Sequence, residues 1–187
     1  MIFILLSIVY ASNLEVTVIN VGQGDSILIK APNGLKILID AGCASDADQL
    51  SRSNAMDNIR NALSSNGISS SSPLDYIIVT HYHGDHYDYI DEVVAEFGLP
   101  KIAVLDRGGN QKWSGGKLAN IPAVYINAIQ ARRNPKGVLS PGAKIDLGQG
   151  AYLLLLCIGY PDHVSAPDKR VKVLGHPDVQ ADGDENV

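Results

Sequence analysis

The chain has 187 residues, enough for one ordinary domain, with 45% hydrophobic and 19% charged residues. This composition supports a single buried core and excludes a disordered or collagen-like chain. Fifteen basic and twenty acidic residues give a net charge of −5, which is not the basic excess of a general nucleic-acid-binding or anionic-membrane-binding surface. An anionic substrate would therefore need a local cation.

The first eleven residues carry no charge, and the first charged residue is Glu15. This apolar stretch is too short for a stable membrane anchor, which takes roughly 20 apolar residues. Residues 9–11 (Val-Tyr-Ala) fit a small-residue cleavage site. Two interpretations stay open: a signal peptide over residues 1–11 of a secreted or periplasmic protein, or an ordinary first strand of a cytoplasmic one. In both cases residues 12–187 form the expected domain.

Three short β-strands are expected next. Residues 14–21 alternate apolar and polar side chains, and residues 26–30 form a second β-rich run, so the two predict a hairpin. Residues 35–40 form a third run that ends at Ala41-Gly42, where glycine permits a sharp exit. Residues 46–64 then carry apolar side chains at helical spacing and predict an amphipathic helix.

The chain has two cysteines, Cys43 and Cys157, too few for a disulfide scaffold and not spaced as a Cys-x-x-Cys zinc or redox pair. We expect two buried thiols. A single disulfide between them is the alternative if the protein is exported.

Three of the five histidines lie within residues 80–86 (Thr-His-Tyr-His-Gly-Asp-His), directly after a buried strand expected over residues 74–80. If the strand conformation continues, His81 and His83 point to the same side because side chains alternate along a strand. Asp85 and His86 would face the same space from the start of a helix that ends at Phe97.

Neutral imidazole and carboxylate groups together suit zinc, and also iron or manganese. We therefore predict that one or two ions are held by His81, His83, Asp85 and His86. The alternative is a polar surface loop in which Asp85 only caps the following helix.

The later part of the chain predicts a strand over residues 101–105 and a glycine-framed loop that carries Trp113, either over a substrate or packed on the core. A helix is expected over residues 120–133, with Arg132 and Arg133 capping its C-terminus rather than binding phosphate. Two further strands are expected, over residues 151–158 and 170–174.

The histidine pattern resembles the metallo-β-lactamase superfamily, whose hallmark is a His-x-His-x-Asp-His loop after a buried strand. Residues 39–42 (Ile-Asp-Ala-Gly) match a second family element, and the resemblance implies that Asp40 orients ligand histidines by accepting their outer N–H. A turn residue is the alternative for Asp40. Residues 18–26 (Val-Ile-Asn-Val-Gly-Gln-Gly-Asp-Ser) resemble the branch that includes the metallohydrolase domain of bacterial DNA-uptake competence proteins. The implied fold is α/β, an αββα four-layer sandwich.

Family members usually add downstream ligands, including a bridging Asp and a final His. Only His163 and His176 follow His86 in this chain, and both lie in turn contexts more typical of solvated histidines. We therefore expect the sandwich to be incomplete at its C-terminus, with the remaining ligands beyond residue 187.

The resemblance implies a metal-dependent hydrolase, in which bound ions lower the pKa of a water from about 15.7 towards about 7 and polarise the scissile group. Asp85 is then the expected catalytic residue, because its loss would perturb both the ions and the activated water. Resemblance to the competence domain favours a phosphoester substrate. The alternatives are a lactamase-like or thioester acyl hydrolase of small molecules, and a degenerate non-catalytic binding domain.

Overall fold

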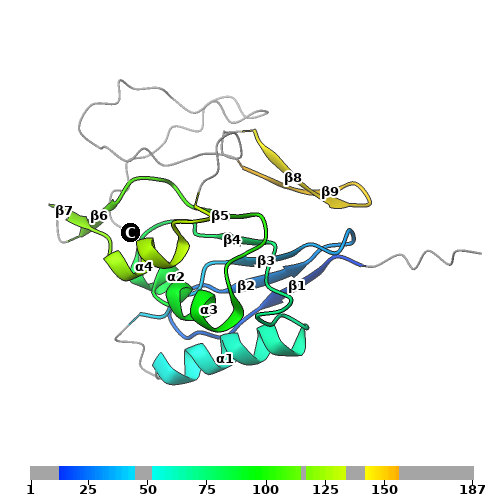
Figure 1. The fold of residues 1–187 in the computed structure, drawn as a ribbon, viewed down its shortest axis with the longest axis horizontal. Helices are drawn as coiled ribbons and strands as arrows, with labels where there is room; N and C mark the ends of the chain where they lie inside the picture. Colours follow the sequence, from blue (N-terminus) through cyan, green and yellow to red (C-terminus); the bar gives the residue numbers. More distant parts are fainter. Residues whose placement is uncertain (1–12, 45–51, 115–116, 134–141, 156–187) are drawn as a thin grey trace, which may run out of the picture.

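The computed structural model describes residues 13–44, 52–114, 117–133 and 142–155, and a mixed five-stranded sheet lies at its centre (Figure 1). The first three strands are antiparallel, whereas the third, fourth and fifth run parallel. Their order along the sheet follows the chain: β1 (Glu15–Val18), β2 (Ile27–Lys30), β3 (Lys36–Ile39), β4 (Tyr76–Ile78) and β5 (Ala103–Leu105). The predicted α/β class is confirmed.

Helices cover one face of this sheet (Figure 1). They are α1 (Arg52–Ser65), α2 (Gly84–Tyr87), α3 (Ile90–Phe97) and α4 (Ala123–Ile129). Leu28, Leu38 and Ile77 point from the sheet into the helical side and are at most 1% exposed. They belong to the same buried cluster as apolar residues of all four helices, among them Ile59, Tyr87, Val93 and Tyr125. Burial of this cluster is the main force that holds the helices on the sheet.

The opposite face of the sheet is covered in part by a two-stranded hairpin, β8 (Lys144–Gly148) and β9 (Ala151–Leu154). Leu147 packs there in a cluster with Ile29 and Ile37. The hairpin is also tied to the β2–β3 turn, because the backbone N–H of Asn33 donates to the carbonyl oxygen of Leu147 at 3.0 Å. The described residues therefore form a helical layer, a sheet and a hairpin on the other face. An outer helical layer beyond the hairpin is not among them.

The single helix expected from Asp85 to Phe97 is wrong: the structure has two helices, α2 and α3, interrupted between them. The break has a physical cause outside the segment. The N–H of Tyr89 donates to the carbonyl oxygen of Ala41 at 2.8 Å, and the carbonyl oxygen of His86 accepts from the N–H of Ala41 at 2.8 Å. These bonds to the turn after β3 replace bonds that a continuous helix would make.

The glycine-framed segment is a β-hairpin rather than a loop, formed by β6 (Gln111–Ser114) and β7 (Lys117–Asn120). The side chain of Trp113 lies outside the described part of the structure, so its predicted placement is untested. The helix expected over residues 120–133 ends at Ile129. After it, the carbonyl oxygen of Arg132 accepts from the N–H of Val104 at 2.9 Å, so the chain joins the edge of β5 instead of capping a helix.

Other predictions fall outside the described residues: the signal peptide over residues 1–11, the strand over residues 170–174, Cys157, and both His163 and His176. Cys43 is buried as expected. Within the described ranges, no helix combines the length and apolar character needed to cross a bilayer.

Backbone-to-backbone contact fixes the turn after β3 against α2. A Cβ added at Gly42 would lie 2.3 Å from the carbonyl carbon of Asp85 and 2.4 Å from the nitrogen of His86. A Cβ at Gly24 would lie 2.5 Å from the carbonyl oxygen of Asp85. The same oxygen accepts a hydrogen bond from the N–H of Asp25 at 3.1 Å. Both glycines of the sequence motifs are thus required by close approach of the chain to α2.

We predict that Gly42→Ala lowers the free energy of unfolding by about 3 kcal/mol or more, because the methyl group overlaps backbone atoms that cannot move independently. Gly34→Ala is the matched control. Gly34 has a φ of +89° and nothing within 4 Å of its added Cβ, so only left-handed backbone strain of about 1–2 kcal/mol is expected. Urea unfolding of both variants measures the difference, and equal losses would contradict the close-approach account.

Candidate metal centre

The candidate site lies at the carboxyl ends of two parallel strands. Asp40 directly follows β3, and residues 80–87, here called the histidine segment, follow β4 after Val79. Neighbouring parallel strands end at the same edge of a sheet, which is where α/β folds place their ligands. The parallel pairing of β3 with β4 therefore brings Asp40 to the histidines.

The strand expected to continue into the histidine segment stops at Ile78. The N–H of Thr80 donates to the Oδ1 of Asp40 at 2.7 Å, so a side chain replaces a strand partner there. The expected convergence of the two histidines is nevertheless present, with His81 Nε2 lying 3.1 Å from His83 Nδ1. Tyr82 between them is buried.

The structure links the four predicted ligands in pairs. The rings of His81 and His86 have centroids 3.9 Å apart, and those of His81 and His83 are 4.7 Å apart. Asp85 Oδ2 lies 3.8 Å from His86 Nε2. Each of the four residues is partly buried.

Asp40 is almost fully buried, with 1% of its surface exposed, and its carboxylate accepts three hydrogen bonds. The donors are the N–H of Thr80 at 2.7 Å, the Thr80 hydroxyl at 2.6 Å and His86 Nδ1 at 2.9 Å. The residue has a φ of +56°, a left-handed conformation that Asp tolerates better than most residues. Since a carboxylate only accepts, Nδ1 of His86 carries a proton, and in the neutral ring Nε2 is the nitrogen with the lone pair.

Thr80 connects Asp40 to His81 and orients that ring as well. Its hydroxyl has a single proton, which goes to Asp40, so its oxygen accepts from His81 Nδ1 at 3.1 Å. Nε2 of His81 therefore also keeps its lone pair. The pKa of His81 lies below its usual range because burial disfavours the imidazolium, and repulsion from His86 and His83 adds to this. His81 is thus held as a neutral imidazole, the form that binds metals.

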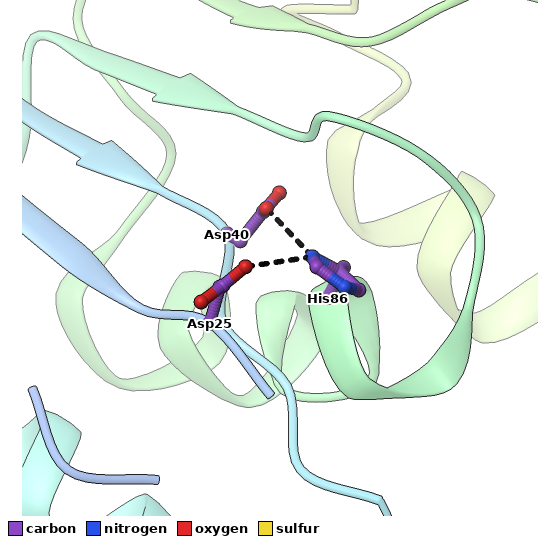
Figure 2. Close-up of side chains that lie close together, drawn as sticks. All are labelled: Asp25, Asp40 and His86. Atoms are coloured by element: carbon purple, nitrogen blue, oxygen red, sulfur yellow. Dashed lines mark hydrogen bonds and ion pairs between the residues drawn. The ribbon is translucent and has the colours of Figure 1, made fainter. Parts of the chain in front are cut away.

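Asp25 is a further acidic residue at the site, and no role was predicted for it from the sequence. Its Oδ2 lies 3.7 Å from His86 Nδ1, and ligand-type atoms of Asp25, Asp40 and His86 all lie within 4.8 Å of one another (Figure 2). The Asp25 side chain is 61% exposed, whereas that of Asp40 is 2% exposed. Its position in the glycine-rich stretch at residues 18–26 is the signal that could have identified it.

Both carboxylates in Figure 2 face Nδ1 of His86, not Nε2. Carboxylates in this position orient a ligand histidine and raise its basicity. The implied role of Asp40 therefore agrees with its geometry. Three imidazoles and the Asp85 carboxylate are a donor set that fits zinc, iron or manganese.

The chain is similar to known proteins in sequence and in structure. A sequence model described as the metallo-beta-lactamase superfamily matches residues 19–165. No match is found among curated proteins. Among solved structures, the chain is similar to MEM-A1, a subclass B3 metallo-beta-lactamase isolated from a soil metagenome library, at 21% identity and a TM-score of 0.44. The similarity covers 71% of this chain and 46% of MEM-A1, so this chain spans about half of that protein's length.

We predict that Asp40→Asn weakens Zn²⁺ binding about 10- to 100-fold, because an amide cannot accept from all three present donors and no longer fixes the histidine tautomers. Asp25→Asn is the matched control. It removes an exposed charge 3.7 Å from the same nitrogen and is expected to change affinity much less. Competition with a chromogenic chelator measures both affinities. A larger loss in Asp25→Asn would show that Asp25 is itself a ligand.

Proposed function

The chain belongs to the metallo-beta-lactamase superfamily, and on this premise we propose that it is a metal-dependent hydrolase with a preference for phosphoester substrates. The observation that carries the proposal is the Asp40 carboxylate, which orients His86 directly and His81 through Thr80, with Nε2 of each ring on the side away from these contacts. A histidine cluster with no chemical role would not require a buried acid behind it.

We propose zinc as the metal, as one or two ions held by His81, His83, Asp85 and His86. When bound, such an ion provides a water activated at neutral pH and polarises the scissile group. The chain's own contribution is preorganisation. Asp40 and Thr80 hold the imidazoles in one tautomer and orientation, so no reorganisation is needed when substrate arrives.

The phosphoester preference rests on a sequence resemblance. The stretch at residues 18–26 resembles that of competence-type metallohydrolases, and it supplies Asp25 to the site. In addition, the net charge of −5 disfavours an anionic substrate unless a cation lies at the site, and a bound metal ion provides that cation. The resemblance supports this substrate class, and the proposed metal ion makes it electrostatically consistent.

The test is hydrolysis of three chromogenic substrates by the purified protein: a phosphodiester, a cephalosporin and a thioester. We predict that the phosphodiester is the best substrate, that chelation abolishes turnover and that added Zn²⁺ restores it. Asp85→Ala should lower kcat/KM about 100-fold or more, because it removes a proposed ligand.

Asp57→Ala is the matched control, since Asp57 is an exposed acid on α1 whose ion pair with Arg60 is screened by solvent. It should leave turnover unchanged. Preference for the cephalosporin or the thioester would replace the substrate class. Turnover that is indifferent to the chelator would overturn metal dependence, and absence of any turnover would favour a non-catalytic binding domain.

A further inference from the structure

We propose that Tyr82 and Arg133 are positioning residues for the candidate metal centre, and that the buried Asp106–Arg133 pair sets the relative placement of His81 and His83 through the Tyr82 hydroxyl. This inference rests on the proposed function, since it concerns the same histidine segment. It assigns a role to side chains that come from β5 and from the segment after α4.

Buried tyrosines of the histidine segment pack against a tyrosine of α4. Tyr82 stands between His81 and His83 in the chain, and Tyr87 follows His86. Both tyrosines are at most 2% exposed. Their rings contact Tyr125 of α4 edge to face, at centroid distances of 6.0 Å and 5.2 Å, and contact each other at 6.1 Å. Such pairs add to simple burial because edge-to-face contact has a preferred geometry.

A buried ion pair lies beside this tyrosine cluster. Asp106 directly follows β5, and its side chain is fully buried. Its Oδ2 accepts from Arg133 Nε at 2.7 Å and from the Tyr125 hydroxyl at 2.9 Å, while Oδ1 accepts from the N–H of Gly108 at 2.9 Å. Burial, with Asp106 nearby, raises the pKa of Tyr125, so its hydroxyl keeps the proton that it donates.

Arg133 connects this ion pair to the histidine segment. Its Nη2 donates to the Tyr82 hydroxyl at 2.6 Å, and its Nη1 donates to the side-chain oxygen of Asn110 at 2.7 Å. A guanidinium group is planar with its donors in a fixed fork. Asp106 holds Nε and Asn110 holds Nη1, so the two contacts together direct Nη2 at the Tyr82 hydroxyl. That hydroxyl in turn donates to the carbonyl oxygen of Gly108 at 3.3 Å.

A tyrosine side chain is rigid from Cβ to its hydroxyl oxygen, and the buried ring of Tyr82 is packed against Tyr87 and Tyr125. A shift of the Tyr82 hydroxyl is therefore transmitted to the backbone that carries His81 and His83 on either side. Their ring nitrogens are only 3.1 Å apart, so a small backbone movement changes the spacing of the two donors. A buried ion pair is by itself weak evidence for stability. Here Nη2 of Arg133, which also donates to the carbonyl oxygen of Gly109, is directed at the residue between two proposed ligands.

The test uses Co²⁺ as a spectroscopic probe of the purified protein. Tyr82→Phe keeps the ring and removes the hydroxyl, and Arg133→Met removes the fork. We expect both variants to bind Co²⁺ about 10-fold or more weakly. At saturating Co²⁺ they should also shift or weaken the visible d–d bands, which report ligand geometry and would not respond to a loss of fold stability alone.

Arg132→Met is the matched control, because the Nε of Arg132 donates to the carbonyl oxygen of Pro100 at 3.3 Å and not to the histidine segment. It should bind Co²⁺ with the wild-type spectrum. If Arg133→Met fails to fold, Tyr82→Phe decides the outcome, since it removes one oxygen atom. Wild-type affinity and d–d bands in Tyr82→Phe would overturn the inference.

The failure of this inference is distinguishable from failure of the proposed function. If wild type binds Co²⁺ and His81→Ala with His83→Ala abolishes binding, the metal centre stands, and an unchanged Tyr82→Phe spectrum overturns the positioning role alone. If the double variant binds Co²⁺ as wild type does, the ligand assignment is wrong, and the positioning role falls with it.

Discussion

The arrangement of the site depends on one buried carboxylate. Asp40 lies at the end of β3 with almost no exposed surface, where an acid without hydrogen-bond donors would be strongly unfavourable. The chain meets this constraint with the N–H and hydroxyl of Thr80 and with Nδ1 of His86. The hydrogen bonds to Asp40 therefore coincide with the end of β4. They also orient His86 directly and His81 through Thr80. Gly42, two residues on, lets the backbone approach α2 closely enough for these bonds to form.

The histidine segment is held from two sides. Asp40 and Asp25 act on the histidine rings, whereas the tyrosine cluster and Arg133 act on the backbone that carries them. These supports come from the ends of three parallel strands, β3, β4 and β5, from α4 and the segment after it, and, for Asp25, from the stretch before β2. A site built this way is set by the register of the sheet, which is more rigid than any single loop.

Much of this arrangement could be predicted from local sequence patterns. Alternation and apolar runs identified the five strands of the sheet, and the spacing within residues 80–86 identified four side chains that the structure links in pairs. The missed features depend on contacts between distant segments. The break between α2 and α3 comes from bonds to Ala41, and Arg133 pairs with Asp106 across the edge of β5 instead of capping a helix. Asp25 is exposed, and although its glycine-rich stretch marks it as a candidate, its place beside His86 comes from the close approach of Gly24 to α2.

The most direct test of the account is X-ray absorption at the zinc K-edge of the Zn²⁺-loaded protein. If His81, His83, Asp85 and His86 hold the metal, we expect a nitrogen and oxygen ligand shell with the multiple-scattering signal of imidazole. We also expect zinc and this signal to be lost together when His81 and His83 are replaced by alanine. A sulfur shell, which would implicate cysteine, or an unchanged spectrum in the double variant would contradict it.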